Sequence, residues 1–162
     1  MRRAVYLGLI VMLTASMGRA EPARADVASR LCPVATPERA KALAERAARY
    51  LARRGADNAF NAFMDPKGKF VDGDLYVFVF DAAGILRASG GWPETVGSRL
   101  APSPDGTGIA GRILGLARTK GRGWVHYNWY SPCSRRMEPK MSYIIKVGDY
   151  IVGVGTYKKL GV

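Results

Sequence analysis

The segment 123–159, which decides the fold of this chain, reads GWVHYNWYSPCSRRMEPKMSYIIKVGDYIVGVGTYKK. Three runs within it, 123–130, 140–147 and 150–159, are rich in β-branched and aromatic residues, which favour strands. Two stretches that contain turn-forming residues, SPCSRRMEP and GD, separate these runs. The pattern therefore predicts three consecutive strands that pair as an antiparallel meander.

The region before this meander predicts two further strands and one helix. The runs DLYVFVFD (74–81) and ILRASGG (85–91) flank the turn sequence AAG, as expected for a hairpin. A loop then leads to IAGRILGLARTK (109–120), in which apolar residues recur at helical spacing. We expect an antiparallel sheet of about five strands, with a helical crossing between the second and third strands.

A long helix is predicted ahead of the sheet. Its sequence, TPERAKALAERAARYLARR (36–54), begins with Thr36 as the N-cap and Pro37 at the first helical position, and Gly55 follows its end. Small apolar residues share one side of this helix, and four arginines share another side: Arg39, Arg46, Arg49 and Arg53. A shorter helical segment, DNAFNAFMD (57–65), follows. A leading helix packed on an antiparallel sheet places the chain in the α+β class.

Residues 1–25 are typical of a signal peptide. A basic pair precedes an apolar run, and small residues follow that allow cleavage after Ala20 or Ala25. A membrane anchor is the alternative, but the run is interrupted by polar residues and is shorter than the ~20 residues that span a bilayer. We therefore expect a periplasmic or secreted protein with one domain over residues 26–162.

The chain contains two cysteines, Cys32 and Cys133. In an exported protein an even number of cysteines predicts a disulfide. This bridge would close a loop of about 100 residues and would restrict the unfolded state. Two unpaired thiols are the alternative, because sequence alone does not bring the two residues together. Two cysteines and one histidine are too few for a metal site without other clustered ligands, so we expect no metal.

The formal net charge of +12 makes the chain strongly basic. Such a charge attracts nucleic acid, acidic lipid headgroups and carboxylates without selecting among them. Single-strand platforms interleave basic and aromatic residues, whereas the aromatic run GWVHYNWY contains no lysine or arginine. We therefore expect no specific nucleic-acid binding.

Signatures of catalysis are absent from the sequence. His126, the only histidine, has no nucleophile motif near it, and strand alternation points it away from Tyr127 and Trp129. The sequence GTGIAG (106–111) fits a dinucleotide-binding pattern but lacks the preceding strand and the later acidic residue that this fold requires. We therefore expect no enzymatic activity, no catalytic residue and no cofactor.

Four segments, taken in order, resemble a single Cache domain of type 2: FNAFMDPKGKFVDGDLYVFVFDAAGILRASGGWP, GRGWVHYNW, EPKMSYIIKV and YIVGVGTYKK. The resemblance extends over roughly residues 38 to 158. Cache domains are extracytoplasmic sensor modules with a PAS-like fold, in which a long helix leads into a curved antiparallel sheet that holds a small ligand. The resemblance thus implies a PAS-like sheet with a ligand pocket, which in this family commonly accepts small organic acids.

The resemblance also implies a set of ligand-binding residues. Strand alternation puts Tyr127 and Trp129 on one face, where they would form apolar walls, and Gly153 and Gly155 would leave space in the concave side. Lys140 would offer a positive charge to a carboxylate. A purely structural role is the alternative for each of these side chains. The full set of candidates is Tyr76, Phe78, Trp92, Tyr127, Trp129, Lys140 and Tyr143.

Two positions depart from the family pattern. Ser89 stands where many relatives carry a histidine, and Trp92 stands where a small polar residue is more usual. These changes alter the pocket, so the identity of the ligand does not follow from the resemblance. Lys140 and Tyr143, which would supply a charge and a hydroxyl, have opposite strand parity and share a pocket only if a bulge or a loop end intervenes.

The sequence thus predicts an exported, stand-alone sensor or binding module for a small ligand, with a small organic acid favoured by the resemblance. A separate partner, such as a membrane-bound receptor or kinase, would receive the signal. The alternative is a basic exported protein that binds an anionic envelope surface or nucleic acid.

Overall fold

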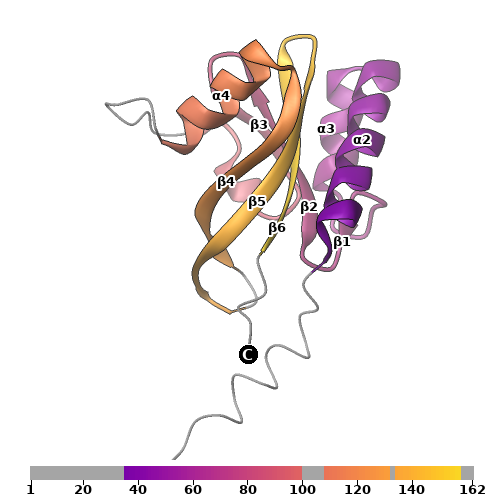
Figure 1. Cartoon of the computed structure of the whole chain (residues 1–162). Coiled ribbons are helices and arrows are strands. Elements are labelled where there is room, and N and C mark those ends of the chain that lie inside the picture. The colour runs from indigo at the N-terminus through magenta and orange to yellow at the C-terminus, as the bar shows by residue number, and fades with distance from the viewer. Residues whose placement is uncertain (1–34, 100–107, 132–133, 158–162) are drawn as a thin grey trace, which may run out of the picture.

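An antiparallel sheet lies between helices on both of its faces (Figure 1). The computed structural model describes residues 35–99, 108–131 and 134–157. In chain order the elements are α2 (Pro37–Arg54), α3 (Ala56–Met64), β1 (Val71–Asp72), β2 (Leu75–Asp81), β3 (Leu86–Ser89), the 3-10 helix η1 (Pro93–Thr95), α4 (Ile109–Thr119), β4 (Arg122–Ser131), β5 (Arg136–Val147) and β6 (Tyr150–Tyr157).

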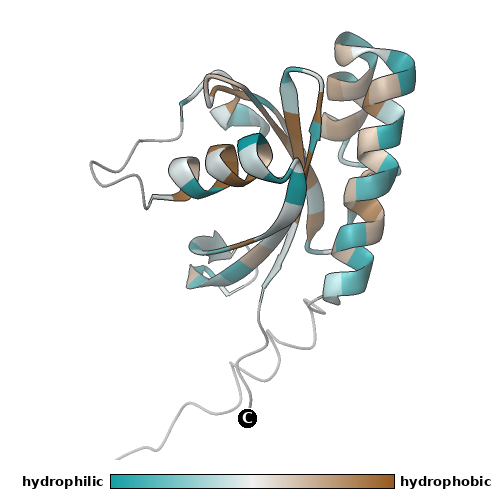
Figure 2. Cartoon of the chain, turned by 45° about the horizontal axis from the view of Figure 1, so that its top comes forward, coloured by the Kyte–Doolittle hydropathy of each residue, from teal (hydrophilic) through white to brown (hydrophobic). Residues whose placement is uncertain are grey.

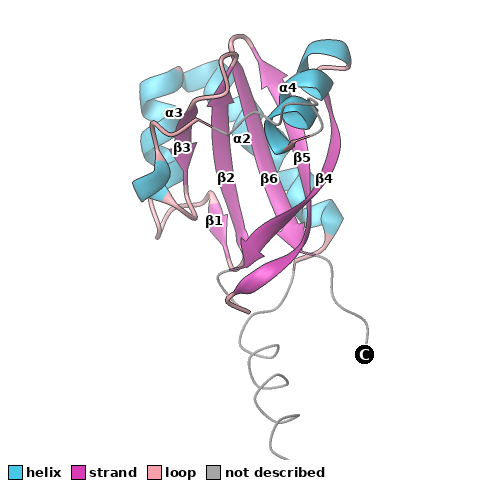
Figure 3. Ribbon diagram, turned by 90° about the vertical axis from the view of Figure 1, so that its left-hand side faces the viewer, coloured by secondary structure: helices cyan, strands magenta, loops and turns pink. Residues whose placement is uncertain are grey.

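The strand order is β1-β2-β6-β5-β4, and β3 pairs with β2 off this path. The last three strands form the predicted meander, and β2 lies beside β6, so the two strand groups form a single sheet (Figure 3). In the register, Lys140 of β5 pairs with Tyr127 of β4 on one side and with Tyr157 of β6 on the other. These three side chains therefore project from the same face of the sheet.

Helix α2 begins and ends at the predicted residues. The Thr36 Oγ1 atom accepts a hydrogen bond from the backbone N–H of Arg39 at 3.3 Å, and Gly55 ends the helix with a φ of 75°. Its buried side consists mainly of alanines, which allow close packing against β5 and β6. Figure 2 shows the hydrophobic residues of α2 turned toward the sheet and the hydrophilic ones turned outward.

The sheet buries apolar side chains on both faces, in two separate clusters. On one face, α2 and α3 cover Leu75, Val77 and Val79 of β2, and on the other face α4 belongs to the cluster that contains Phe78 and Phe80. Every residue of β2 before Asp81 is consequently buried, which explains its continuous apolar run. Strand β4 lies at the edge of the sheet, and its burial is close to alternating.

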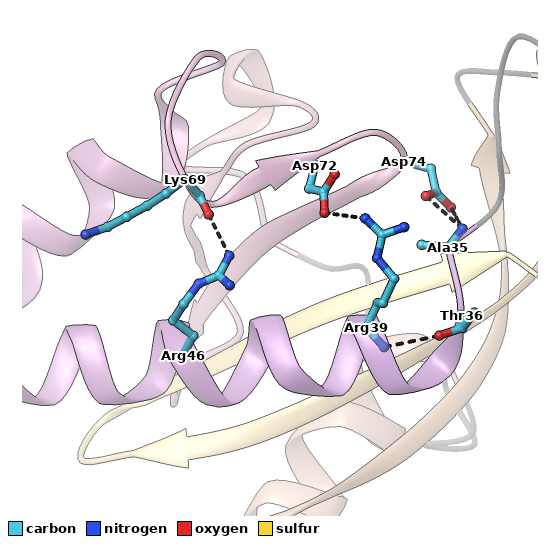
Figure 4. A network of polar contacts seen from close by, with 7 residues as sticks. All are labelled: Ala35, Thr36, Arg39, Arg46, Lys69, Asp72 and Asp74. Atoms are coloured by element: carbon cyan, nitrogen blue, oxygen red, sulfur yellow. Dashed lines mark hydrogen bonds and ion pairs between the residues drawn. The ribbon is translucent and has the colours of Figure 1, made fainter.

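Polar contacts attach the basic side of α2 to the segment before β2 (Figure 4). Arg39 Nη2 donates to Asp72 Oδ2 at 2.5 Å, and Arg46 Nη2 donates to the carbonyl oxygen of Lys69 at 2.7 Å. Both contacts are exposed, so each contributes little to stability. Because of these contacts, the side chains of Arg39 and Arg46 point toward acceptors within the protein.

The predicted α+β class, the leading helix and the helical crossing are confirmed. Within the described residues the sheet has six strands, close to the expected number of about five, and the additional strand β1 consists of two residues and is too short to produce a sequence pattern. Strand β5 starts at Arg136, four residues before the predicted start at Lys140, within the stretch predicted as a turn. None of the described helices is long and apolar enough to cross a bilayer.

Two predictions fall outside the described residues. These are the leader, 1–25, with its cleavage after Ala20 or Ala25, and the bridge between Cys32 and Cys133. Export and oxidation of the chain therefore stay predictions.

Candidate ligand-binding site

A cavity of about 400 Å³ lies between α4 and the face of the sheet that α2 does not cover. Residues from β2, β3, β4 and β5, from the loop that contains η1 and from α4 line this cavity. Its lining is mostly aromatic and aliphatic, with a few polar groups, as is usual for small-molecule sites. The lining residues are Tyr76, Phe78, Phe80, Leu86, Ser89, Trp92, Thr95, Ser98, Arg99, Ile109, Ile113, Tyr127, Trp129 and Lys140.

Lys140 is the buried cation of this cavity. The side chain is 3% exposed, and its Nζ donates to the hydroxyl of Tyr76 at 2.8 Å and to the hydroxyl of Tyr157 at 3.5 Å. The same nitrogen lies 4.3 Å from the ring centre of Tyr76 and 4.8 Å from that of Tyr157. These rings partly compensate the loss of water through cation–π attraction.

Little negative charge lies near the amine of Lys140 to balance its positive charge. Burial lowers its pKa from 10.5 to about 7, and the negative charge of Asp74 offsets only part of this effect. The carboxylate of Asp74 instead accepts the backbone N–H of Ala35 at 3.0 and 3.2 Å. Among the residues that the structure describes, no carboxylate lies within 4.0 Å of the Lys140 amine.

The tyrosines around Lys140 are neutral and do not balance its charge. Burial raises the pKa values of Tyr76, Tyr127 and Tyr157. The Tyr127 hydroxyl lies 2.7 Å from Ser142 Oγ, and the Tyr157 hydroxyl donates to the carbonyl of Tyr130 at 2.7 Å. The hydroxyl oxygen of Tyr76 accepts a hydrogen bond from the amine of Lys140. The O–H of Tyr76 can therefore donate to an anion that is bound beside this amine.

Trp92 adds a second hydrogen-bond donor to the cavity. Ser89 Oγ accepts the backbone N–H of Trp92 at 3.0 Å, so the two departures from the family pattern are in direct contact. The indole lies close enough to Tyr76 to offset part of the rise in the pKa of that phenol. Its buried Nε1–H nevertheless makes no aligned hydrogen bond within the described part of the chain. An unpaired donor of this kind favours a ligand with an acceptor oxygen.

Gly153 and Gly155 of β6 make room for two of the lining side chains. A Cβ atom at Gly153 would overlap the ring of Phe78, and a Cβ atom at Gly155 would overlap Lys140 Cε and Ser142 Oγ. The sequence interpretation expected these glycines to leave empty space in the concave face. The structure instead fills that space with Phe78 and with the aliphatic stem of Lys140, which therefore reaches Tyr76.

The structure brings six of the seven predicted candidates to this cavity and excludes one. Tyr143 does not line it, and the prediction of a pocket hydroxyl from this residue is corrected. Tyr143 is 8% exposed on the opposite face of the sheet, where its ring packs 5.1 Å from Trp124 and beneath Lys41 of α2. No bulge interrupts the pairing of β4 with β5 there, so strand parity separates it from Lys140.

Some lining residues were missed by the sequence interpretation. Phe80 shares the parity of Tyr76 and Phe78 on β2, so alternation alone could have identified it. Ile109 and Ile113 are four residues apart on α4, but their spacing does not tell which face of the sheet the helix covers. His126 is exposed, and the described residues contain no cluster of metal-ligating side chains.

Residues 35–159 match the family model of the single Cache domain 2. The chain belongs to this family. Cache domains are extracytoplasmic, ligand-binding sensor modules, and this class of protein is not catalytic. The family thus makes this chain a ligand-sensing module, and the cavity beside Lys140 is its candidate binding site.

Solved structures of other sensors are similar to this Cache domain. A methyl-accepting chemotaxis protein from Vibrio parahaemolyticus RIMD 2210633 is 18% identical, with a TM-score of 0.61, and the match covers 83% of this chain and 92% of that one. A Cache chemosensory domain that recognises carboxylic acid is also 18% identical, with a TM-score of 0.58 over 86% of this chain and 99% of that one. The periplasmic sensor domain of a chemotaxis protein is 25% identical, with a TM-score of 0.53 and the same shares covered.

Proposed function

We propose that this Cache domain is an exported sensor for a small organic acid, and that Lys140 binds the carboxylate of that ligand. The observation that carries the proposal is a buried amine that faces the cavity without a carboxylate partner among the described residues. A buried charge is costly when it is unpaired, and a bound anion removes much of this cost. The ligand would thus supply the counter-charge that this part of the protein lacks.

The donors near Lys140 also fit a carboxylate. The Tyr76 hydroxyl and the unpaired Nε1–H of Trp92 lie at the same cavity as the amine, and a carboxylate accepts several hydrogen bonds at once. Hydrogen bonds to an ionised group are stronger than those between neutral groups. The similar Cache domain that recognises carboxylic acid supports the same ligand class by analogy.

We further propose that the domain signals through a membrane-bound receptor or kinase. The similar structures include a methyl-accepting chemotaxis protein and a periplasmic sensor domain of a chemotaxis protein, which favours a receptor-type output. A basic surface protein for nucleic acid or envelope is less well supported. Tyr127 and Trp129 line the cavity rather than an open sheet face, and Arg39 and Arg46 contact acceptors within the protein (Figure 4).

Calorimetric titration of matched acids and amides tests the ligand class. At pH 6.5, where Lys140 is largely charged, we expect propionate to bind and propionamide to bind at least tenfold more weakly. Substitution Lys140→Met should weaken propionate binding by roughly 10- to 100-fold, because a hydrogen bond to a charged group contributes about 1.5–3 kcal/mol. Binding of the amide should change little between the two proteins.

Two results would overturn this proposal. The first is that no monocarboxylic acid, short or long, binds at millimolar concentration. The second is that acids bind equally well to the wild type and to Lys140→Met. Tight, salt-sensitive binding of single-stranded oligonucleotides in the same buffers would then favour the basic-surface function.

A further inference from the structure

The cavity is polar around Lys140, and farther along β2 its buried lining is apolar, with the exposed residues Ser98 and Arg99 beside Leu86. Lys140, the Tyr76 hydroxyl and the Trp92 indole form the polar end. Tyr76 and Phe80 are four residues apart on β2 and both line the cavity, so the lining extends about 13 Å along this strand. Around Phe80 the neighbours are apolar: the ring of Phe78 packs against it, Leu86 pairs with it from β3, and Ile113 belongs to the same apolar cluster.

The volume is large for a short acid. At about 400 Å³ the cavity falls in the range of sites that bind drug-sized molecules. One water molecule takes up about 30 Å³ of the liquid, and acetate or propionate has the volume of only a few waters. A short acid on Lys140 would therefore leave most of the apolar end unfilled, and that part offers water few hydrogen-bonding partners.

The mouth of the cavity provides only weak recognition for a second charge. Arg99 lines the cavity but is exposed, and its Nη1 already donates to the carbonyl of Ala83 at 2.6 Å. Solvent and salt screen such a charge, whereas the amine of Lys140 is buried. A dicarboxylic acid would thus gain little from its second carboxylate. At the apolar end this group would lose its water without finding a partner, and at Arg99 solvent and salt would screen the attraction.

We infer that the ligand is a monocarboxylic acid with an extended apolar or aromatic body, such as octanoate or 3-phenylpropionate, rather than a short acid. This inference rests on the proposed function, because it takes the carboxylate to lie at Lys140. The apolar body then runs along β2 toward Phe80, Leu86 and Ile113. Burial of each further methylene there removes apolar surface from water, which is the source of selectivity for longer acids.

An acid series measured by calorimetry at pH 6.5 tests the inference. Acetate, butyrate, hexanoate and octanoate should bind with affinities that rise by about fourfold for each buried methylene. Octanol should bind more weakly than octanoate, because it lacks the charge. Suberate, which has a carboxylate at each end, should also bind more weakly than octanoate.

A matched pair of substitutions on α4 locates the apolar body. Ile109 lines the cavity from the first turn of α4 and is only partly buried, so Ile109→Trp should narrow the cavity without disrupting the core. We expect it to weaken octanoate binding by tenfold or more, with a smaller loss for shorter acids. Leu114, partly buried on the same helix, does not line the cavity, so Leu114→Trp should leave octanoate binding within about twofold of the wild type.

The outcomes separate this inference from the proposed function. If propionate binds as tightly as octanoate and both depend on Lys140, the carboxylate site stands and the inference about the apolar body is wrong. Tighter binding of suberate than of octanoate would contradict it too, and would assign a recognition role to Arg99. If no acid in the series binds, both proposals fall together.

Discussion

Lys140 shows how a binding group can oppose the stability of the free protein. Its amine is buried beside Tyr76 and Tyr157, and burial lowers its pKa to about 7. In the unfolded chain the same amine keeps its ordinary pKa of 10.5, so it binds a proton more tightly there. Folding therefore competes with protonation of Lys140 over the pH range between these two values.

The stability of the ligand-free protein should consequently rise with pH between about 7 and about 10. The unfolded state binds more protons at this position in that window, and stability rises with pH wherever this is so. At pH values below the lower of these two limits, the buried charge of Lys140 reduces the free energy of unfolding by its full amount, on the order of a few kcal/mol. Urea unfolding at pH 6, 7, 8 and 9 measures this dependence, and Lys140→Met should be more stable than the wild type at pH 6, with a smaller difference at pH 9.

Lys146→Met is the matched control for this measurement, because Lys146 is an exposed lysine on the same strand. The control should follow the pH dependence of the wild type. If the stability of Lys140→Met and of Lys146→Met depended on pH in the same way, burial of the Lys140 amine would not be what lowers the stability of the folded protein.

At the scale of elements, strand alternation predicted much of the site. The parity of β4 correctly put Tyr127 and Trp129 on one face, and the opposite parities of Lys140 and Tyr143 correctly warned against a shared pocket. Which of the two residues faces the cavity could not be predicted, because both strand faces of β5 carry apolar side chains. That choice depends on where α2 and α4 pack, and their packing joins residues far apart in the sequence.

The close packing at Gly155 could not be predicted from the sequence either. A glycine in a strand indicates a bulge, a bend or a close approach, but not the partner that approaches. Here Gly155 of β6 pairs with Ser142 of β5, and the group that approaches it is the stem of Lys140, two residues away along β5. Gly155 thus sets the position of the amine from a neighbouring strand.

Substitution Gly155→Ala tests this positioning. The added methyl group would overlap Lys140 Cε and Ser142 Oγ, so we expect a loss of about 1–3 kcal/mol of stability from overpacking. We also expect the affinity for a monocarboxylate to fall by roughly tenfold or more, since the amine must move from its hydrogen bond with Tyr76. Chemical denaturation and calorimetry measure the two effects separately.

Gly115→Ala serves as the control glycine. Gly115 lies inside α4, and a Cβ atom there would meet nothing within 4 Å. This substitution should stabilise the protein by roughly 0.5–1 kcal/mol, because alanine favours the helix, and should leave acid binding unchanged. Unchanged binding in Gly155→Ala would mean that the position of Lys140 does not depend on this glycine.

At the scale of the whole molecule, the sheet separates a dense core on one face, which stabilises the fold, from the candidate binding cavity on the other face. One face is closed by α2 and α3 over a dense core that includes Phe63 and Phe70. The other face is covered by the shorter helix α4 and by the loop with η1, and it encloses the cavity. The length and apolar pattern of the segments predicted the helices and strands, and the resemblance with strand alternation predicted a pocket with six of its lining residues. The full lining, which comes from side chains of six different segments, became visible only in the structure.

The uptake of protons on binding tests the central claim most directly. On this account, a carboxylate binds beside the charged form of the Lys140 amine. In the ligand-free protein at pH 8, this amine is mostly neutral. Binding must therefore bring a proton with it, and the measured binding enthalpy must change with the ionisation enthalpy of the buffer. Calorimetry at pH 8 in phosphate and in Tris, with octanoate or propionate, whichever binds more tightly, should show uptake of at least about half a proton per ligand by the wild type. Lys140→Met should show none, and a wild type that binds the acid without taking up a proton would contradict the account.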